Sequence, residues 1–163
     1  LLTSDLRRVQ FHSVANELLL EVSGEQFTQL IRYRDGGTMV LAAPDALVAS
    51  SATMPLGDSS SAGRNDIVYL AHRQSHDGRI GVAAMLVQKE TTYNGHPVFR
   101  LTSLNGEVVL EGNSGGGILF NGKLIGNMWG TILVEDVSGA VAYSRQQTTF
   151  SLAAQLPTRV LAQ

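Results

Sequence analysis

Residues 112–130 read GNSGGGILFNGKLIGNMWG, and this stretch guides the interpretation of the whole chain. It begins with Gly112 to Gly117, in which Ser114 is enclosed by glycines. Glycine permits backbone angles and close approaches that other residues forbid, so such a serine can lie exposed on a tight turn. An apolar run, the Asn121-Gly122 pair and a second apolar run follow, and this order predicts a β-hairpin.

Further turn signals predict an antiparallel all-β protein. Asp35-Gly36-Gly37, Asn94-Gly95 and Asn105-Gly106 each lie between apolar runs. Asn and Gly readily adopt the positive φ angles that tight hairpin turns need. Residues 54–64 are rich in Gly and Ser and predict a surface loop. The runs interpreted as strands are 17–22, 26–34, 38–43, 66–72, 80–88, 98–101, 107–110, 116–120, 123–131 and 140–143.

Composition limits the classes of function. The 163 residues are 44% hydrophobic and 16% charged, which indicates a folded domain with a core rather than a disordered chain. The net charge of −2 gives no electrostatic footprint for nucleic acid, and no apolar run is long enough to cross a bilayer. The chain has no cysteine, so disulfides and thiolate metal sites are excluded, and we predict no metal and no cofactor. A start at Leu1 suggests an excised or processed domain.

The 112–130 stretch resembles the nucleophile loop of chymotrypsin/trypsin-type serine proteases. In that family, Gly-Asp/Asn-Ser-Gly-Gly opens a hairpin whose return strand ends in Trp-Gly. The resemblance implies that Ser114 is the nucleophile and that the backbone N–H groups of Gly112 and Ser114 form the oxyanion hole. Asn113, where many members have Asp, resembles the compact bacterial Deg/HtrA-like and other short forms.

The same resemblance implies a substrate-binding cleft. Met128, Trp129 and Gly130 would line the strand along which an extended polypeptide binds. Val108, six residues before Ser114, would form the base of the side-chain pocket and favour apolar side chains.

A second stretch resembles the strand that carries the family's aspartate. Residues 65–70 read NDIVYL, similar to Asp-Ile-Ala-Leu-Leu, which implies that Asp66 orients the catalytic histidine. Asp66 precedes Ser114 by 48 residues (114 − 66), a spacing suited to compact members. An aspartate before a strand is also a common turn residue, and this alternative stays open.

The family's histidine has no counterpart in the matching stretch. Residues 40–47 read VLAAPDAL, so Pro44 stands in the histidine position and Asp45 follows it. Proline cannot accept the serine proton, and a carboxylate with a pKa of about 3.9 is poorly matched to that task at neutral pH. We expect His12, His72, His76 and His96 to be surface residues rather than bases, and His72 to lie roughly 20 Å from Asp66 along one strand.

The resemblance implies a single trypsin-like domain, 1–163, with two six-stranded antiparallel β-barrels. The expected parts are an N-terminal barrel in 1–72, a C-terminal barrel in 80–149 and a segment 150–163 with a short helix. Leu152, Leu156 and Val160 have helical spacing, which supports that helix. The resemblance also implies an extracytoplasmic location, in the bacterial envelope or secreted.

Three functions follow as hypotheses. The first is a catalytically impaired protease-like domain that binds extended polypeptide in the old substrate cleft. The second is an active serine endopeptidase that uses Ser114 with an unconventional or externally supplied base. The third is a structural β-domain, which predicts a buried Ser114 whose flanking N–H groups are bonded internally.

Overall fold

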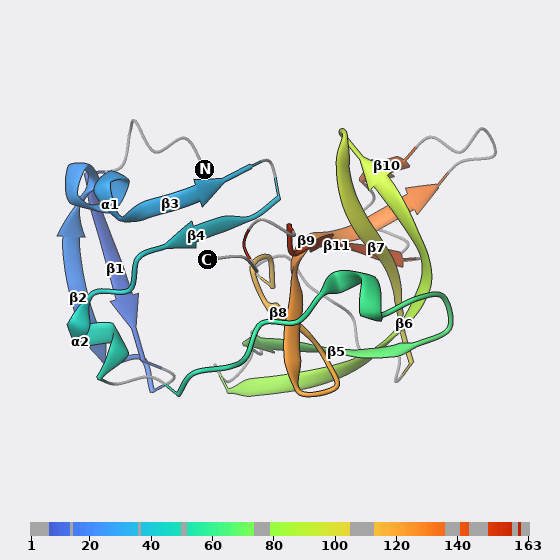
Figure 1. The fold of residues 1–163 in the computed structure, drawn as a ribbon, viewed down its shortest axis with the longest axis horizontal. Coiled ribbons are helices and arrows are strands. Elements are labelled where there is room, and N and C mark those ends of the chain that lie inside the picture. The colour runs from blue at the N-terminus through green and yellow to red at the C-terminus, as the bar shows by residue number, and fades with distance from the viewer. Residues whose placement is uncertain are drawn as a thin grey trace. The chain divides into compact units, whose positions relative to one another are not determined.

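The computed structural model describes residues 7–13, 15–35, 37–49, 52–73, 79–104, 113–135, 141–143, 150–157 and 160. It divides the chain into two compact units, residues 1–53 and residues 54–163. The structure is mostly β and contains a closed six-stranded barrel, which confirms the all-β prediction (Figure 1). No helix in the described part of the chain is long and apolar enough to span a membrane.

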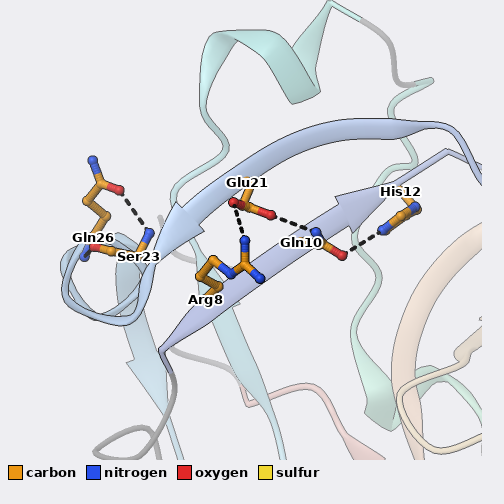
Figure 2. Close-up of polar contacts among 6 residues, drawn as sticks. All are labelled: Arg8, Gln10, His12, Glu21, Ser23 and Gln26. Atoms are coloured by element: carbon orange, nitrogen blue, oxygen red, sulfur yellow. Dashed lines mark hydrogen bonds and ion pairs between the residues drawn. The ribbon is translucent and has the colours of Figure 1, made fainter.

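The first unit contains two antiparallel strand pairs and two short helices. Its elements are β1 (Arg8–His12), β2 (Leu18–Ser23), α1 (Gly24–Leu30), β3 (Ile31–Arg34), β4 (Met39–Leu41) and α2 (Asp45–Val48). Strand β1 pairs with β2 and β3 pairs with β4. The carboxylate of Glu21 accepts hydrogen bonds from Arg8 (3.3 Å) and Gln10 (2.6 Å) across the β1–β2 pair, as Figure 2 shows.

Helix α1 corrects the prediction of a strand over 26–34. Ser23 and Gln26 form a capping box, in which the Ser23 hydroxyl accepts from the Gln26 N–H (3.1 Å) and the Gln26 side chain accepts from the Ser23 N–H (2.9 Å) (Figure 2). These two bonds satisfy backbone donors that a helix start leaves unpaired. Phe27 is buried, and only residues 31–34 of the predicted strand are extended.

The second unit contains the closed barrel. Its strands are antiparallel, in the order β10-β9-β11-β7-β6-β5-β8, and β8 also pairs with β9. Six strands therefore close into a barrel, and β10 is attached outside on β9. The bounds are β5 (Ile67–Arg73), β6 (Ile80–Tyr93), β7 (His96–Ser103), β8 (Gly117–Phe120), β9 (Lys123–Glu135), β10 (Val141–Tyr143) and β11 (Phe150–Gln155), with a 3-10 turn at Ser59–Ser61.

The boundary between the two units lies earlier in the chain than the predicted gap between a barrel in 1–72 and a barrel in 80–149. Strand β5, which was expected in the N-terminal barrel, pairs with both β6 and β8 in the closed barrel. Arg73 lies opposite Ile80, so the intervening residues connect two strands of one antiparallel pair. The compact units divide between residues 53 and 54 instead.

The C-terminal segment contains a strand where a helix was expected. Strand β11 pairs with β7 on one edge and with β9 on the other, and so completes the barrel. Residues 151–154 are all at most 3% exposed. Their spacing cannot distinguish a short buried strand from a buried helix, because both are apolar on every side. After the strand, Val160 is helical, and its N–H donates to the Pro157 carbonyl (2.8 Å).

The predicted Asn-Gly turns hold the barrel hairpins. Asn94 and Gly95 connect β6 to β7, and Asn121 and Gly122 connect β8 to β9, all with positive φ. The pair Asn105-Gly106 lies outside the described residues. The barrel interior is filled by apolar side chains that include Val68, Leu70, Met85, Val87, Phe99, Leu101, Ile118, Ile125 and Met128.

Candidate functional site

Backbone hydrogen bonds form the turn that carries Ser114. The Gly116 N–H donates to the Asn113 carbonyl (3.0 Å), and Gly115 adopts a φ of +90° that favours glycine. The Gly115 N–H donates to the Met128 carbonyl (2.7 Å), and the Met128 N–H donates to the Gly116 carbonyl (2.8 Å). The turn is therefore fastened to β9 at two points, and the side chain of Ser114 is exposed.

Ser114 is an exposed residue that carries a hydroxyl. Its hydroxyl donates to the Trp129 carbonyl at 3.4 Å, a long hydrogen bond. Within the described ranges, no imidazole hydrogen-bonds this hydroxyl and no group accepts from the Ser114 N–H. Gly112, which carries the other predicted oxyanion donor, lies outside the described residues.

A histidine lies beside this turn. Ala71 of β5 is opposite Gly117 of β8, so the next residue, His72, reaches the start of the turn. The Asn113 side-chain nitrogen, in a residue only 7% exposed, is 3.4 Å from Nδ1 of His72. An amide nitrogen only donates, so this contact needs an unprotonated Nδ1, with the imidazole proton on Nε2. The sequence predicts only an ordinary surface residue at His72, because it gives no sign that β5 pairs with β8.

Asp66 lies at the other end of β5. Its carboxylate accepts from the Gly63 N–H (2.8 Å) and closes a local turn. The segment from Asp66 to Ala71 is five residues long, which corresponds to about 16 Å of strand. The structure therefore does not bring Asp66 to Ser114, and the open alternative of a turn residue describes its contacts.

One edge of β9 lies next to Ser114. On the opposite edge, β11 pairs with β9 from Gly126 to Leu133. On the edge near Ser114, β8 pairs with β9 only as far as Asn127, and β10 pairs from Leu133 onward. Among the described residues, no strand pairs with this edge over 129–132.

The ring of Trp129 packs over β11 toward β7 and β6, on the side of β9 away from this edge. The ring of Trp129 meets Tyr93 edge to face at 5.2 Å and His96 at 5.8 Å. The β9–β11 register shifts at Trp129, a bulge that turns a side chain away from the regular alternation. His96 is therefore part of an aromatic cluster rather than the solvated loop residue that was expected.

The other predicted site residues have different positions. Met128 is 1% exposed, so its side chain is in the core. Only its backbone contributes to the site, through its hydrogen bonds to the Ser114 turn. Gly130 of β9 lies opposite Leu152 of β11. Pro44 and Asp45 belong to the first unit, where Pro44 precedes α2 and its carbonyl accepts from the Leu47 and Val48 N–H groups. Val108 lies outside the described residues.

Comparisons with known protein families, curated proteins and solved structures find no match to this chain.

Proposed function

We propose that this chain is a trypsin-type serine-protease-like domain that binds extended polypeptide along residues 129–132 of β9 and hydrolyses it poorly or not at all. The observation that carries this proposal is the exposed Ser114, whose N–H donates to no described residue, beside residues 129–132 of β9, where no described strand pairs with the near edge. A scaffolding β-domain would instead bury Ser114 and bond its N–H internally. The observed exposure favours a binding site.

The chemistry of the edge identifies its occupant. A strand edge offers alternating N–H and C=O groups, which an added extended peptide satisfies with its own backbone. Side chains of the added strand alternate between two faces, so those on the Trp129 face would lie next to Trp129. Apolar side chains are the best match to this neighbour, because their burial removes apolar surface from water.

Impaired hydrolysis follows from the surroundings of the hydroxyl. A nucleophilic serine needs a base that takes its proton, and here Ser114 donates to a backbone carbonyl. Loss of one triad member slows known serine proteases by about 10⁴ to 10⁶, while binding and the oxyanion hole persist. Pro44 in the histidine position agrees with that loss.

The proposal extends to the finer fold. A six-stranded antiparallel closed barrel is the unit of which the trypsin-like fold has two, and residues 54–163 contain one. We assign this barrel to the C-terminal half of that fold. Residues 1–53 would be a reduced form of the other half.

A second candidate is an active endopeptidase in which His72 replaces the missing histidine. The observation that favours it is the Asn113–His72 contact, which brings an imidazole to the residue before Ser114. Neutral His72 could accept the serine proton only if a side-chain rotation brought an unprotonated ring nitrogen to the hydroxyl.

The sole tryptophan of the chain, Trp129, provides the test of binding. A capped apolar hexapeptide is titrated into the protein while tryptophan emission is recorded. We expect a saturable change in emission. A peptide of the same sequence with N-methylated backbone nitrogens should give none, because it cannot form the strand hydrogen bonds. Equal responses to the two peptides would contradict strand addition, and Tyr69→Ala, an exposed aromatic on β5, is the control for nonspecific contact.

Labelling with a fluorophosphonate separates the two candidates. We expect no labelling above that of Ser114→Ala. Robust labelling that disappears in both Ser114→Ala and His72→Gln would overturn the impaired form and establish the active one.

A further inference from the structure

A pocket of about 420 Å³ is lined almost entirely by hydrogen-bond donors. Its volume is within the range of small-molecule sites, roughly 300–1,000 Å³. Three of its lining residues are cations, two are amides and one is apolar. They are Arg64, Lys89, Arg100, Asn65, Gln88 and Leu86.

A bulge in β6 brings the cations together. The β6–β7 register shifts between Val87 and Lys89, so Gln88 is an extra residue and Lys89 lies directly opposite Arg100. A bulge of this kind turns side chains that regular alternation would separate toward one place. The loop before β5 supplies the third cation, and Asn65, at a φ of +74°, anchors that loop by donating its N–H to the Val87 carbonyl (2.8 Å).

The arrangement of these side chains favours a bound negative charge. Like charges directly opposite on two strands repel each other. None of the six described lining residues is acidic, and Arg64 forms no ion pair within the described part of the chain. Burial lowers the pKa of the Arg100 guanidinium, because partial removal of water disfavours its charged form. A bound anion would offset both effects.

The donors of the site select the anion. Three cationic and two amide side chains offer more donors than the two oxygens of a carboxylate can accept, whereas a phosphate monoester presents three oxygens and nearly two negative charges. The planar guanidinium group of an arginine can donate two hydrogen bonds at once to the oxygens of a phosphoryl group. The side-chain amides of Asn65 and Gln88 add neutral donors. A nucleic acid would need a basic stripe, and this chain has a net charge of −2.

We propose that the pocket of Arg64, Lys89 and Arg100 binds the divalent phosphoryl group of a small ligand. Arg64 and Asn65 precede β5, whereas the Ser114 turn lies beside the far end of that strand, so the site is independent of the proposed peptide-binding edge.

The test uses the full chain and two small anions of similar shape at constant ionic strength. Methyl phosphate at pH 8 is divalent, and methanesulfonate is monovalent. Backbone amide shifts of residues 64, 65 and 89 are followed by NMR in the intact protein and in Arg64→Gln, Lys89→Gln and Arg100→Gln. Lys123→Gln, an exposed cation in the same barrel, is the matched control.

We expect saturable binding of methyl phosphate and weaker binding of methanesulfonate. Each of the three pocket variants should weaken methyl phosphate binding about tenfold or more, since each removes one charge-assisted hydrogen bond. Lys123→Gln should bind as the intact chain does. Arg64 and Lys89 are not buried, so these two variants keep the test valid if Arg100→Gln fails to fold.

Three results would overturn the proposal. The first is unchanged methyl phosphate binding in both Arg64→Gln and Lys89→Gln. The second is equal affinity for the two anions, which would exclude selection of a divalent group. The third is tighter, pocket-dependent binding of a short RNA, which would assign the surface to a polyanion. The peptide titration of Trp129 in the same variants is expected to be unchanged, so failure of one site does not imply failure of the other.

Discussion

At the scale of single residues, Gly116 connects the barrel to the candidate site. A Cβ atom at this position would lie 2.6 Å from the Ala71 carbonyl oxygen and 3.0 Å from that of Asn113. Both atoms belong to backbone that cannot withdraw cheaply. Gly116→Ala should therefore displace the Ser114 turn from β5, lower the free energy of unfolding by about 1–3 kcal/mol and abolish the peptide response of Trp129.

Denaturant unfolding of Gly116→Ala beside Gly63→Ala measures this effect. A Cβ atom at Gly63 would meet no other atom within 4 Å, and Gly63 has no positive φ, so its substitution should be neutral. Equal stability of the two variants would contradict the close approach at Gly116.

The residue-scale predictions succeed where the signal is local. The glycines around Ser114 and the Asn-Gly pairs indicated turns, because positive φ angles favour these residue types. The Asn113–His72 contact joins residues 41 apart in sequence and exists only because β5 pairs with β8. No local pattern contains that information. Asp66 was ambiguous for the same reason, since a turn-closing aspartate and a catalytic one look alike before the strand pairing is known.

At the scale of elements, the β1–β2 hairpin carries a pH-sensitive contact. The hydrogen bond from Gln10 is the main cause that lowers the pKa of the Glu21 carboxyl; burial opposes it, and the charge of Arg8 adds to it. A lowered carboxyl pKa stabilises the folded state above the unfolded value of about 4.3, and this contribution disappears as the pH falls through the folded pKa.

We therefore expect the hairpin to lose stability when the pH is lowered from 7 to 3. Glu21→Gln should make the hairpin less sensitive to pH over that range. NMR shifts of residues 8–12 report the change, and Glu17→Gln, an exposed glutamate before the same strand, is the control. The same pH response in both variants would show that Glu21 does not cause it.

Element types were predicted where turns and periodicity agree. The β6–β7 and β8–β9 hairpins follow from Asn-Gly between apolar runs. Helix α1 was missed, although Ser23 and Gln26 have the spacing of a capping box, because the apolar residues of 26–34 resembled a strand. Strand β11 was missed because it is buried on all sides, and its identity depends on the two strands that it joins.

At the scale of the whole molecule, the barrel closes without residues 1–53. Every strand pair of the barrel lies in residues 54–163, and the bridge of Leu56 to Leu124 lies there too. A fragment of residues 54–163 should therefore fold alone. Its Trp129 emission and amide NMR spectrum should match those of the same residues in the full chain. A spectrum with the narrow dispersion of an unfolded chain would contradict this.

The family resemblance predicts two six-stranded barrels; the described residues contain one closed barrel, and the sequence did not indicate which strands form it. Strand β5 was assigned to a first barrel on its similarity to an aspartate-bearing strand, whereas its hydrogen bonds join it to β6 and β8. Whether a strand belongs to a closed sheet depends on the two strands that pair with it. The strand's own sequence does not show which strands these are. For the same reason, the sequence did not predict the edge of β9 at residues 129–132, where no described strand pairs. This edge can be recognised only once the pairings of β8, β10 and β11 are known.

The backbone bonds of the Ser114 turn have a consequence for how this chain can change over generations. Gly115, Gly116 and Met128 hold the turn through N–H and carbonyl groups alone, and the serine hydroxyl adds one long bond at the surface. Selection for stability therefore preserves the shape of the turn without preserving the hydroxyl. Ser114 is free to drift to another small residue unless binding or chemistry at this position contributes to fitness.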